Sequence, residues 1–359
     1  MLQTQNLRIA EFAPLPTPRQ LEDELATTLA VRQMVQASRQ AVSDMLHGRA
    51  TRKLVVVVGP CSIHDAGVAL DYATRLKRVA DQTADHLLIV MRTYFEKPRT
   101  VTGWKGLVSD PNLDGSCDIP AGLALARKIL LDITGLGLPC ATEFLDTVVP
   151  HYLADMVTWA AIGARTTESQ VHRQMASGLS MPVGFKNSTD GSLQNAVNAV
   201  LSARSSHAFL GINADGLSSV VKTTGNQDCH IVLRGGASGA NYHREDVATA
   251  ARAVENQGLA RGVMVDCSHG NSGKDHARQG AVFAEVVHNF VTGQRAILGV
   301  MVESNLRPGK QTWMQGAPLE YGISITDGCI GWDETERILL EAADQLSRAD
   351  AGASRAAAG

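Results

Sequence analysis

The chain lacks several features that mark whole classes of proteins. Its six cysteines form no C-x-x-C pair and no dense framework, which indicates free thiols in a reducing compartment. No apolar run approaches the length of a membrane span, and residues 1–16 hold Glu11 and prolines where a signal peptide would have an apolar segment. The sequence therefore predicts a cytoplasmic protein that does not enter a membrane.

Other absences limit the chemistry. The 33 basic and 36 acidic residues leave a formal charge of −3, which gives no reason to expect a nucleic acid partner. No G-x-G-x-x-G follows a predicted strand and no Walker A sequence is present, so a nicotinamide or nucleotide cofactor is not indicated. No nucleophile elbow accompanies a Ser/His/Asp arrangement.

Eight short apolar runs recur in the chain, each with the length of a buried strand. They cover residues 54–58, 87–91, 139–144, 159–164, 182–185, 230–233, 262–265 and 296–302. Segments with helical periodicity lie between them, at residues 66–80, 119–136, 147–157, 168–179, 192–204, 244–257 and 275–292. This alternation predicts an α/β fold, a (β/α)8 TIM barrel, with a doubly wound open sheet as the alternative.

The remaining segments flank or interrupt this barrel, which we place at residues 51–346. Residues 1–50 are read as an arm followed by a helix over 21–46, and arms of this kind often pack on another subunit or cover one end of a core. Residues 207–224 resemble an inserted β-hairpin, with the turn at 213–216. We expect the tail at 347–359 to be disordered.

Five basic residues lie at four of the predicted strand–loop junctions. In a barrel, these carboxyl ends of the strands meet at one face and carry the chemistry. The five cations are Arg92, Lys97, Arg165, Lys186 and Arg234. They predict a pocket for phosphate or carboxylate groups. The alternatives are a ring of salt bridges to Glu143, Asp266 and Glu303 and, for residues 91–100, a solvated basic loop paired with Glu96.

A second set of residues at the same face could ligate a metal ion. Cys61, His269, Glu303 and Asp327 offer one sulfur, one nitrogen and two oxygen donors. Such a set suits Mn, Fe, Co or Zn better than Mg or Ca, which prefer oxygen alone. Taken singly, each of these residues is equally consistent with a buried thiol, a satisfied histidine or an ordinary surface carboxylate. Among the other histidines, His64 is the best candidate for a supporting role.

Several long motifs resemble those of one enzyme family. They lie at residues 59–65 (GPCSIHD), 91–100 (MRTYFEKPRT), 103–106 (GWKG), 163–169 (GARTTES), 182–187 (PVGFKN), 233–236 (LRGG), 265–271 (VDCSHGN), 302–304 (VES) and 324–327 (SITD). On these motifs, the chain resembles the type I (class I alpha) synthases of 3-deoxy-D-arabino-heptulosonate 7-phosphate (DAHP). The resemblance extends from the N-terminal arm to about residue 345.

The resemblance implies a reaction and its residues. Members condense phosphoenolpyruvate with erythrose 4-phosphate, the first step of the shikimate pathway, and need a divalent metal. It implies that Cys61, His269, Glu303 and Asp327 hold the metal and that Arg92, Lys97, Arg165, Lys186 and Arg234 bind phosphoenolpyruvate. Erythrose 4-phosphate falls on Lys97, Pro98, Arg99 and Thr100, with Asp327 close by. Lys97 is the catalytic cation, and Asp327, His269 or Glu143 is expected to assist the attacking water.

The resemblance also implies feedback inhibition by an aromatic amino acid and assembly into a homodimer or homotetramer. The effector site is expected near Leu7 and Ile9 of the arm and at Pro150, Leu179, Ser180, Phe209, Gly211 and Val221. The phenylalanine-sensitive branch tends to carry serine where Gly211 stands, so this chain resembles the tyrosine-sensitive branch more closely. Under the simpler interpretation, the apolar members of this set are ordinary core residues.

Three other functions are compatible with parts of the sequence. An inactive phosphosugar-binding barrel would be expected to have lost metal ligands, and a synthase of eight-carbon sugar acids would lack the Lys-Pro-Arg-Thr loop at 97–100. A metal-dependent hydrolase or isomerase would not need five cations. The metal, the effector, the assembly and the group that activates water remain open.

Overall fold

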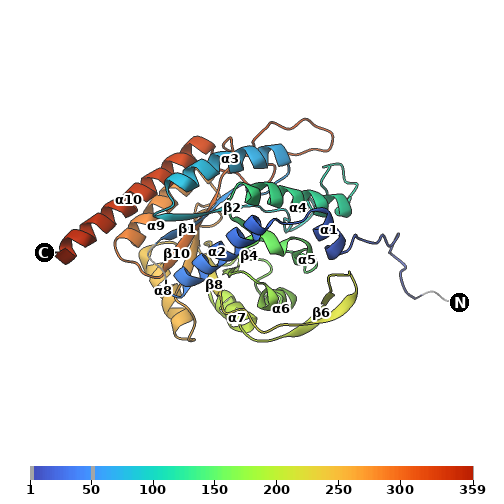
Figure 1. Cartoon of the computed structure of the whole chain (residues 1–359), viewed down its shortest axis with the longest axis horizontal. Coiled ribbons are helices and arrows are strands. Elements are labelled where there is room, and N and C mark those ends of the chain that lie inside the picture. Colours follow the sequence, from blue (N-terminus) through green and yellow to red (C-terminus); the bar gives the residue numbers. More distant parts are fainter. Residues whose placement is uncertain (1–3, 50–52, 359) are drawn as a thin grey trace.

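The computed structural model describes residues 4–49 and 53–358, so the predicted boundary between residues 50 and 51 lies outside the described residues. Eight parallel strands form a closed barrel (Figure 1). They are β1 (Leu54–Gly59), β2 (Leu87–Arg92), β3 (Cys140–Glu143), β4 (Val157–Ile162), β5 (Val183–Lys186), β8 (Cys229–Leu233), β9 (Val263–Asp266) and β10 (Ile297–Glu303). Because β1 pairs with both β2 and β10, the predicted TIM barrel is confirmed and the open sheet is wrong.

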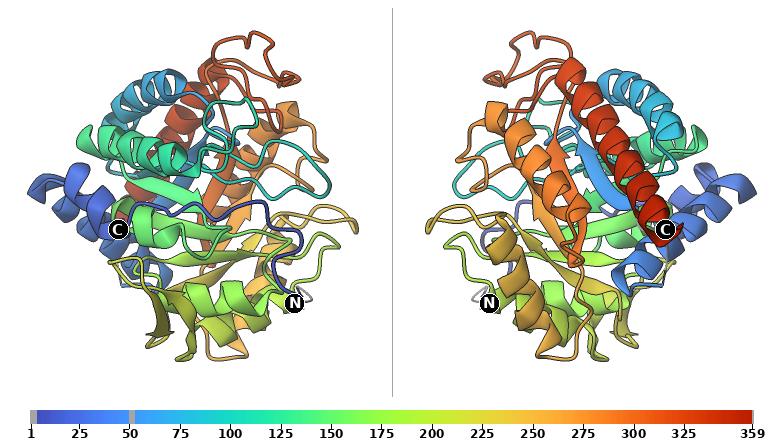
Figure 2. Two further views of the ribbon diagram at one scale, coloured as in Figure 1. Left: turned by 90° about the vertical axis from the view of Figure 1, so that its right-hand side faces the viewer. Right: turned by 90° about the vertical axis from the view of Figure 1, so that its left-hand side faces the viewer.

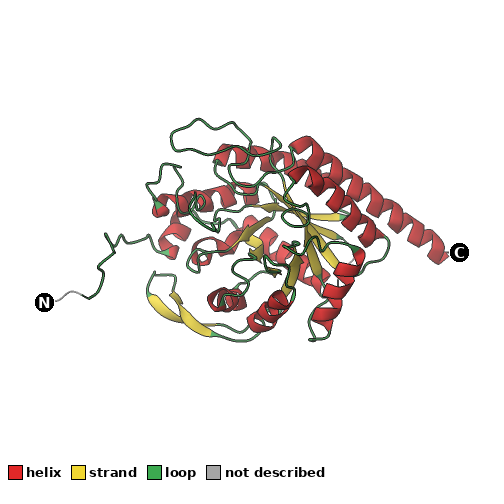
Figure 3. Cartoon of the chain, turned by 180° about the vertical axis from the view of Figure 1, so that it is seen from behind, coloured by secondary structure: helices red, strands yellow, loops and turns green. Residues whose placement is uncertain are grey.

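Helices surround the barrel on the outside (Figure 3). They are α3 (Ala66–Gln82), α4 (Ile119–Gly135), α5 (Pro150–Leu153), α6 (Gln170–Gly178), α7 (Gln194–Ala203), α8 (Arg244–Glu255), α9 (Gln279–Val291) and α10 (Trp332–Ala358), with short 3-10 turns at Ala154–Met156 and His276–Arg278. The helix predicted over 147–157 is shorter, because the fully buried β4 already begins at Val157 and pairs there with Cys140.

Alternate residues of the barrel strands pack against one another in the barrel interior. This cluster includes Val57, Val90, Trp159 and Met264, as expected when successive side chains of a strand point to opposite faces. Val42 and Leu46 of helix α2 (Leu29–Leu46) belong to the same cluster. Helix α2 therefore closes the amino-terminal end of the barrel and leaves the carboxyl end for the site.

The helix predicted over 21–46 is interrupted in the structure. Helix α1 (Pro18–Glu24) ends before α2 begins, and each has its own cap. The Thr28 hydroxyl accepts the backbone N–H of Val31 at 3.2 Å, and Thr17 caps α1 in the same way. Threonine caps start new helices, since they satisfy backbone donors that lack a partner in the first turn.

Truncating Leu46 to alanine is expected to destabilise the protein by about 2–5 kcal/mol, because it leaves a cavity where α2 seals the barrel. Leu46 is 4% exposed, and a Cβ built on Gly262 would lie 2.5 Å from its Cδ1. The matched control is Leu29→Ala in the same helix, where the side chain is 65% exposed. Urea unfolding measures both, and equal effects of the two variants would contradict the role of α2.

Strands β6 (Ala208–Ile212) and β7 (Ser218–Lys222) form a separate antiparallel pair, which confirms the predicted hairpin. The Asn213 side chain accepts the backbone N–H groups of Asp215 and Leu217, both at 3.0 Å, and so organises the turn. Arg19 at the start of α1 binds the Asp215 carboxylate at 2.7 Å. The arm and the hairpin turn are thus held together within one chain.

The last helix differs from the expectation of a disordered tail. Helix α10 continues through residues 347–358 to Ala358, and alanine and arginine are among the best helix formers. At its start, the Trp332 ring meets Tyr72 of α3 edge to face, with centroids 5.4 Å apart. Its carboxyl end extends beyond the strands in Figure 1, and the right-hand view of Figure 2 shows α10 (red) in front of them. No helix of the described residues is long and apolar enough to cross a membrane.

Candidate active site

The charged side chains of the site continue the inward-facing rows of the barrel strands. Val90 and Met264 belong to the interior cluster, and Arg92 and Asp266 stand two residues later on the same strands. A step of two residues keeps a side chain on the same face of a strand. The same step leads to Glu143, Lys186, Arg234 and Glu303. Apolar layers therefore lie below, and a ring of charge lies at the carboxyl end.

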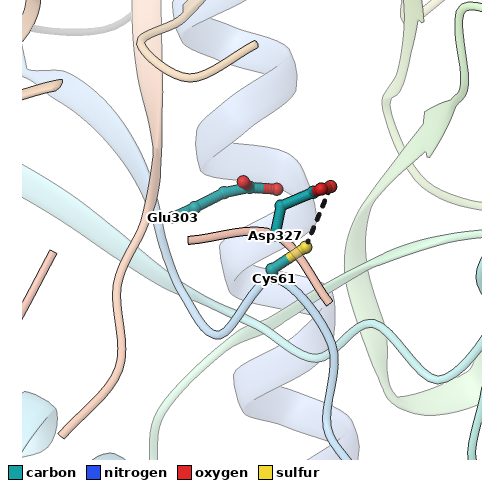
Figure 4. A group of neighbouring side chains, drawn as sticks. All are labelled: Cys61, Glu303 and Asp327. Carbon is teal, nitrogen blue, oxygen red and sulfur yellow. Dashed lines mark hydrogen bonds between the residues drawn. The ribbon is translucent and has the colours of Figure 1, made fainter. Parts of the chain in front are cut away.

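Three of the four predicted metal ligands meet at this end (Figure 4). One ligand atom each of Cys61, Glu303 and Asp327 lies within 4.8 Å of the others. Cys61 follows β1 and Glu303 ends β10, and these strands are neighbours, which brings the two residues together. Asp327 comes from the loop before α10, and its Oδ2 lies 3.6 Å from the Cys61 Sγ.

The chemistry of this trio fits a divalent transition metal. Burial, together with the nearby Glu303 carboxylate, raises the pKa of the Cys61 thiol, while Lys97 opposes this rise. The two carboxylates disfavour a negative charge on the neighbouring sulfur. A bound metal ion would let the thiolate form. The mixture of one sulfur with oxygen donors favours Mn, Fe, Co or Zn.

His269, the fourth predicted ligand, lies outside this compact trio. Its Nδ1 is 3.0 Å from the Asp266 carboxylate and 2.6 Å from the Ser268 hydroxyl oxygen. Its backbone φ of 56° is left-handed, a conformation that non-glycine residues adopt rarely and often at functional sites. With Nδ1 engaged, Nε2 is the atom through which His269 could bind a metal.

Two of the five predicted cations form buried ion pairs, as the salt-bridge alternative expected. The Arg92 guanidinium lies 2.9 Å from the Glu303 carboxylate, and Lys186 Nζ lies 3.0 Å from Asp266. Burial alone would raise the pKa of Asp266, but Lys186 and His269 hold it well below its usual range. These two pairs fix the positions of their cations.

The other cations are placed differently. Lys97 Nζ lies 3.1 Å from the Cys61 sulfur, next to the metal trio. Within residues 4–49 and 53–358, neither Arg165 nor Arg234 has a carboxylate at ion-pairing distance. Burial lowers the pKa of Arg234, Asp266 opposes this, and Arg165 adds to the lowering. Two guanidinium groups that repel each other at a barrel mouth form a site for an anion.

The loop after β2 carries the residues expected to bind the sugar phosphate. The backbone N–H of Lys97 donates to Lys105 O at 2.8 Å and so closes the loop. Pro98 is half-buried, whereas Arg99 and Thr100 are exposed. The Arg99 guanidinium lies over Gly103, whose φ of 143° is a backbone conformation that residues with a side chain rarely adopt. Arg99 is left facing solvent, where a phosphate could reach it.

Glu96 does not pair with the basic loop, so that alternative is wrong. Its side chain is buried, and it accepts the backbone N–H groups of Leu145 and Asp146 at 3.2 and 3.0 Å. Burial raises the pKa of Glu96 to about 8. Glu96 therefore joins the loop that carries Lys97 to the loop that follows β3.

Tyr94 is a further residue of the site that the sequence pattern did not single out. Its ring centroid lies 3.6 Å from the Arg92 Cζ. A cation above an aromatic face is stabilised by the ring quadrupole. The available signal was the alternation of β2, which places Tyr94 on the inward side when continued past Arg92. The positioning contact of Ser268 with His269 had no comparable signal.

The six predicted effector residues lie around the hairpin, α5 and the end of α6. Phe209 stands opposite Val221, and a Cβ on Gly211 would lie 3.9 Å from His151 of α5. The Leu179 carbonyl accepts the Asn226 amide at 3.1 Å. The remaining two, Pro150 and Ser180, line a cavity of about 650 Å³ beside α2.

This cavity lies away from the barrel mouth. It is also lined by Pro182 and Asp228, which directly precede β5 and β8 and so lie at the amino-terminal end of the barrel. Leu7 and Ile9 of the arm are exposed. The structure therefore brings the hairpin and α5 parts of the predicted site together, whereas Leu7 and Ile9 remain on the surface of the arm.

Comparison with known proteins agrees with this geometry. The model of the DAHP synthetase I family matches residues 31–340. The chain is 50% identical over 343 residues to the phospho-2-dehydro-3-deoxyheptonate aldolase, Tyr-sensitive, of Escherichia coli K12, which covers 95% of this chain and 96% of that protein. The Phe-sensitive protein of the same strain is also 50% identical, over 96% of this chain and 98% of that protein.

A third relative, the Trp-sensitive aldolase of Enterobacter agglomerans, is 50% identical over 97% of this chain and 99% of that protein. Because the chain is equally identical to Tyr-, Phe- and Trp-sensitive forms, these comparisons do not distinguish between the three effectors. A solved aldolase structure from Francisella tularensis SCHU S4 superposes with a TM-score of 0.91 at 46% identity, covering 94% of this chain and 98% of that one. With matches that span nearly its whole length, the chain belongs to the DAHP synthetase I family.

Proposed function

We propose that the protein condenses phosphoenolpyruvate with erythrose 4-phosphate and water to give DAHP and phosphate, the first step of the shikimate pathway. One observation carries this proposal. Arg165 and Arg234, which have no carboxylate partner among the described residues, share a barrel mouth with the trio of Cys61, Glu303 and Asp327. An anion site beside a metal site suits the joining of two phosphorylated substrates.

The cations divide the binding of phosphoenolpyruvate between them. Arg165, Lys186 and Arg234 hold its phosphate, and Arg92 holds its carboxylate. The ion pair of Arg92 with Glu303 keeps the guanidinium in place before the substrate arrives. Lys186 is held in the same way by Asp266. Such pre-positioned charges need little reorganisation when substrate binds.

Cys61, His269, Glu303 and Asp327 would hold the metal ion, which when bound supplies Lewis acidity to the aldehyde of erythrose 4-phosphate. Carbon 3 of phosphoenolpyruvate attacks that aldehyde carbon. The Lys97 ammonium, 3.1 Å from the Cys61 sulfur, donates to the oxygen on which charge develops. Water then adds at carbon 2, assisted by Asp327, His269 or Glu143, and phosphate leaves.

The sugar phosphate lies along the loop of residues 97–100. Its aldehyde end approaches Lys97 and Asp327, and its phosphate approaches Arg99 and Thr100. Both of these residues are exposed, which lets a second substrate enter after the first. The buried Glu96 holds this loop by its two backbone contacts at 3.2 and 3.0 Å.

The initial rate of phosphoenolpyruvate consumption tests this function. We expect turnover with erythrose 4-phosphate and Mn(II), loss of turnover after metal removal by a chelator, and recovery on adding metal back. The readout is the loss of phosphoenolpyruvate absorbance. Absence of turnover with every divalent metal tried, together with retained phosphosugar binding, would instead identify an inactive regulatory barrel.

We further propose that tyrosine is the inhibitor and that it binds between the hairpin, α5 and the end of α6. Gly211 carries no side chain there, which leaves room for a phenolic hydroxyl. A Cβ at this position would lie 2.7 Å from the Val221 Cγ2, so any side chain at 211 would press on the opposite strand.

Gly211→Ser is therefore expected to weaken inhibition by tyrosine and to strengthen inhibition by phenylalanine, while kcat without effector stays unchanged. Ser219→Ala, which alters the cross-strand neighbour of Gly211, is the matched control. Inhibition curves for the three aromatic amino acids measure the change. An unaltered effector preference in Gly211→Ser would contradict the role of this glycine.

We also propose that the protein forms a homodimer or homotetramer in the cytoplasm. All six cysteines are free, as expected in a reducing compartment. Phe12 of the arm and Leu210 of the hairpin are large apolar side chains that are 76% and 88% exposed, and such groups favour contact with another subunit. Analytical ultracentrifugation tests the assembly.

A further inference from the structure

We propose that Asp266 is a positioning residue that fixes two parts of the site at once, the imidazole of His269 and the ammonium group of Lys186. This inference rests on the proposed function, because it concerns how the same site holds its metal ion and its anionic substrate. Asp266 is the last residue of β9, and no part of its side chain is exposed. It lies outside the compact trio of Cys61, Glu303 and Asp327.

The two carboxylate oxygens of Asp266 have different surroundings: Oδ1 accepts hydrogen bonds, whereas Oδ2 has no aligned hydrogen-bond donor among the described residues and lies at ion-pair distance from two basic groups. Oδ2 lies 3.0 Å from Lys186 Nζ and 3.0 Å from His269 Nδ1. Oδ1 accepts the Ser268 hydroxyl at 2.6 Å and the Ser268 backbone N–H at 3.0 Å. A carboxylate surrounded in this way influences the site through Lys186 and His269, which it positions.

These contacts determine which nitrogen of His269 carries hydrogen. The Ser268 hydroxyl gives its hydrogen to Asp266 Oδ1, so its oxygen, 2.6 Å from His269 Nδ1, can only accept. Nδ1 therefore donates its hydrogen to the Ser268 oxygen, with the Asp266 carboxylate at ion-pair distance on the same side, which leaves the lone pair on Nε2. Metal-binding histidines use this arrangement, in which a carboxylate fixes the ring and its tautomer.

The same oxygen also orients Lys186. In the barrel, β8 lies between β5, which ends in Lys186, and β9, which ends in Asp266, so the contact crosses over one strand. Asp266 therefore holds the Lys186 ammonium group in place at the mouth, where phosphoenolpyruvate would bind.

Two variants of the full-length, metal-free protein separate these roles. Asp266→Asn removes the charge that serves both partners, whereas Ser268→Ala removes the hydroxyl contacts with His269 and with Asp266 Oδ1 and leaves the pair of Lys186 with Asp266 Oδ2 in place. Calorimetric titration measures Mn(II) affinity and, separately, phosphoenolpyruvate affinity. We expect Asp266→Asn to weaken Mn(II) binding by about 10–100-fold and to weaken phosphoenolpyruvate binding as well. Ser268→Ala should weaken Mn(II) binding and leave phosphoenolpyruvate affinity unchanged.

A folded Asp266→Asn protein that binds Mn(II) as tightly as the parent would overturn the proposal. If that variant does not fold, the tautomer of His269 decides. Nitrogen-15 NMR of histidine-labelled, metal-free parent protein, assigned by comparison with His269→Gln, should show hydrogen on Nδ1, and hydrogen on Nε2 would refute the inference. These readouts need no turnover, so a parent protein without synthase activity would contradict the proposed function alone.

Discussion

Replacing Lys97 with methionine is expected to lower kcat by about 10²–10³, the usual effect of removing one donor to a developing oxyanion. Burial alone would lower the pKa of Lys97, but Cys61 and Glu303 raise it above its ordinary value, so the ammonium keeps its proton. Methionine fills a similar volume without charge. The loss should therefore appear in kcat, which steady-state kinetics with saturating substrates measures.

The matched control for this substitution is Lys105→Met. Lys105 lies in the same loop with an exposed side chain, and it contacts Lys97 only through its backbone oxygen. We expect its kcat to remain close to that of the parent. If both variants lost activity equally, the loop rather than the Lys97 ammonium would be responsible.

Replacing Glu303 with alanine is expected to destabilise the protein by about 3–5 kcal/mol and to abolish tight metal binding. The carboxylate is buried with Arg92, and its removal leaves a guanidinium without a counter-charge inside the barrel. The same change removes one of the three clustered ligand residues. Urea unfolding measures the first effect, and titration of the metal-free protein measures the second.

An exposed ion pair serves as the control for stability. Arg337 and Glu341 on α10 are joined at 2.8 Å, but each side chain is 55% exposed. Glu341→Ala should cost at most about 1 kcal/mol, because water and salt screen such pairs. Comparable losses of stability in both variants would mean that burial does not determine how much the Arg92–Glu303 pair contributes to stability.

The strand ends show why much of the site could be predicted. Buried strands that finish in Arg92, Lys186 and Asp266 bring those charges to one face, because parallel strands of a barrel share a direction. Strand order then makes Cys61 and Glu303 neighbours. The pattern contained this information, since it depends on the period of two and on closure of the barrel alone.

Details that depend on the path of loops could not be predicted in this way. The sequence placed Glu96 among basic residues, yet the chain turns it inward to the backbone of Leu145 and Asp146. The pattern predicts His269 at the site face, but its left-handed backbone and its contact with Ser268 arise from a turn after β9. Such details of the loops depend on packing between residues that are far apart in the sequence.

Secondary-structure boundaries failed for a related reason. The periodicity over residues 21–46 continues across Thr28, but the threonine cap starts a new helix there. Val157 fitted the end of a helical pattern, although pairing with β3 draws it into β4. In both cases, a contact made by one residue outweighed the hydrophobic period of its neighbours.

Closure of the barrel by α2 has a consequence for engineering. The apolar layers lie between Leu46 and the charged ring, so the packing of α2 contributes to stability at a distance from the residues that perform chemistry. Changes at sites without shared partners usually combine additively. Substitutions that strengthen the packing of α2 should therefore raise the free energy of unfolding. Destabilising substitutions in the loops at the opposite end, as in a library selected for new substrates, should then be better tolerated.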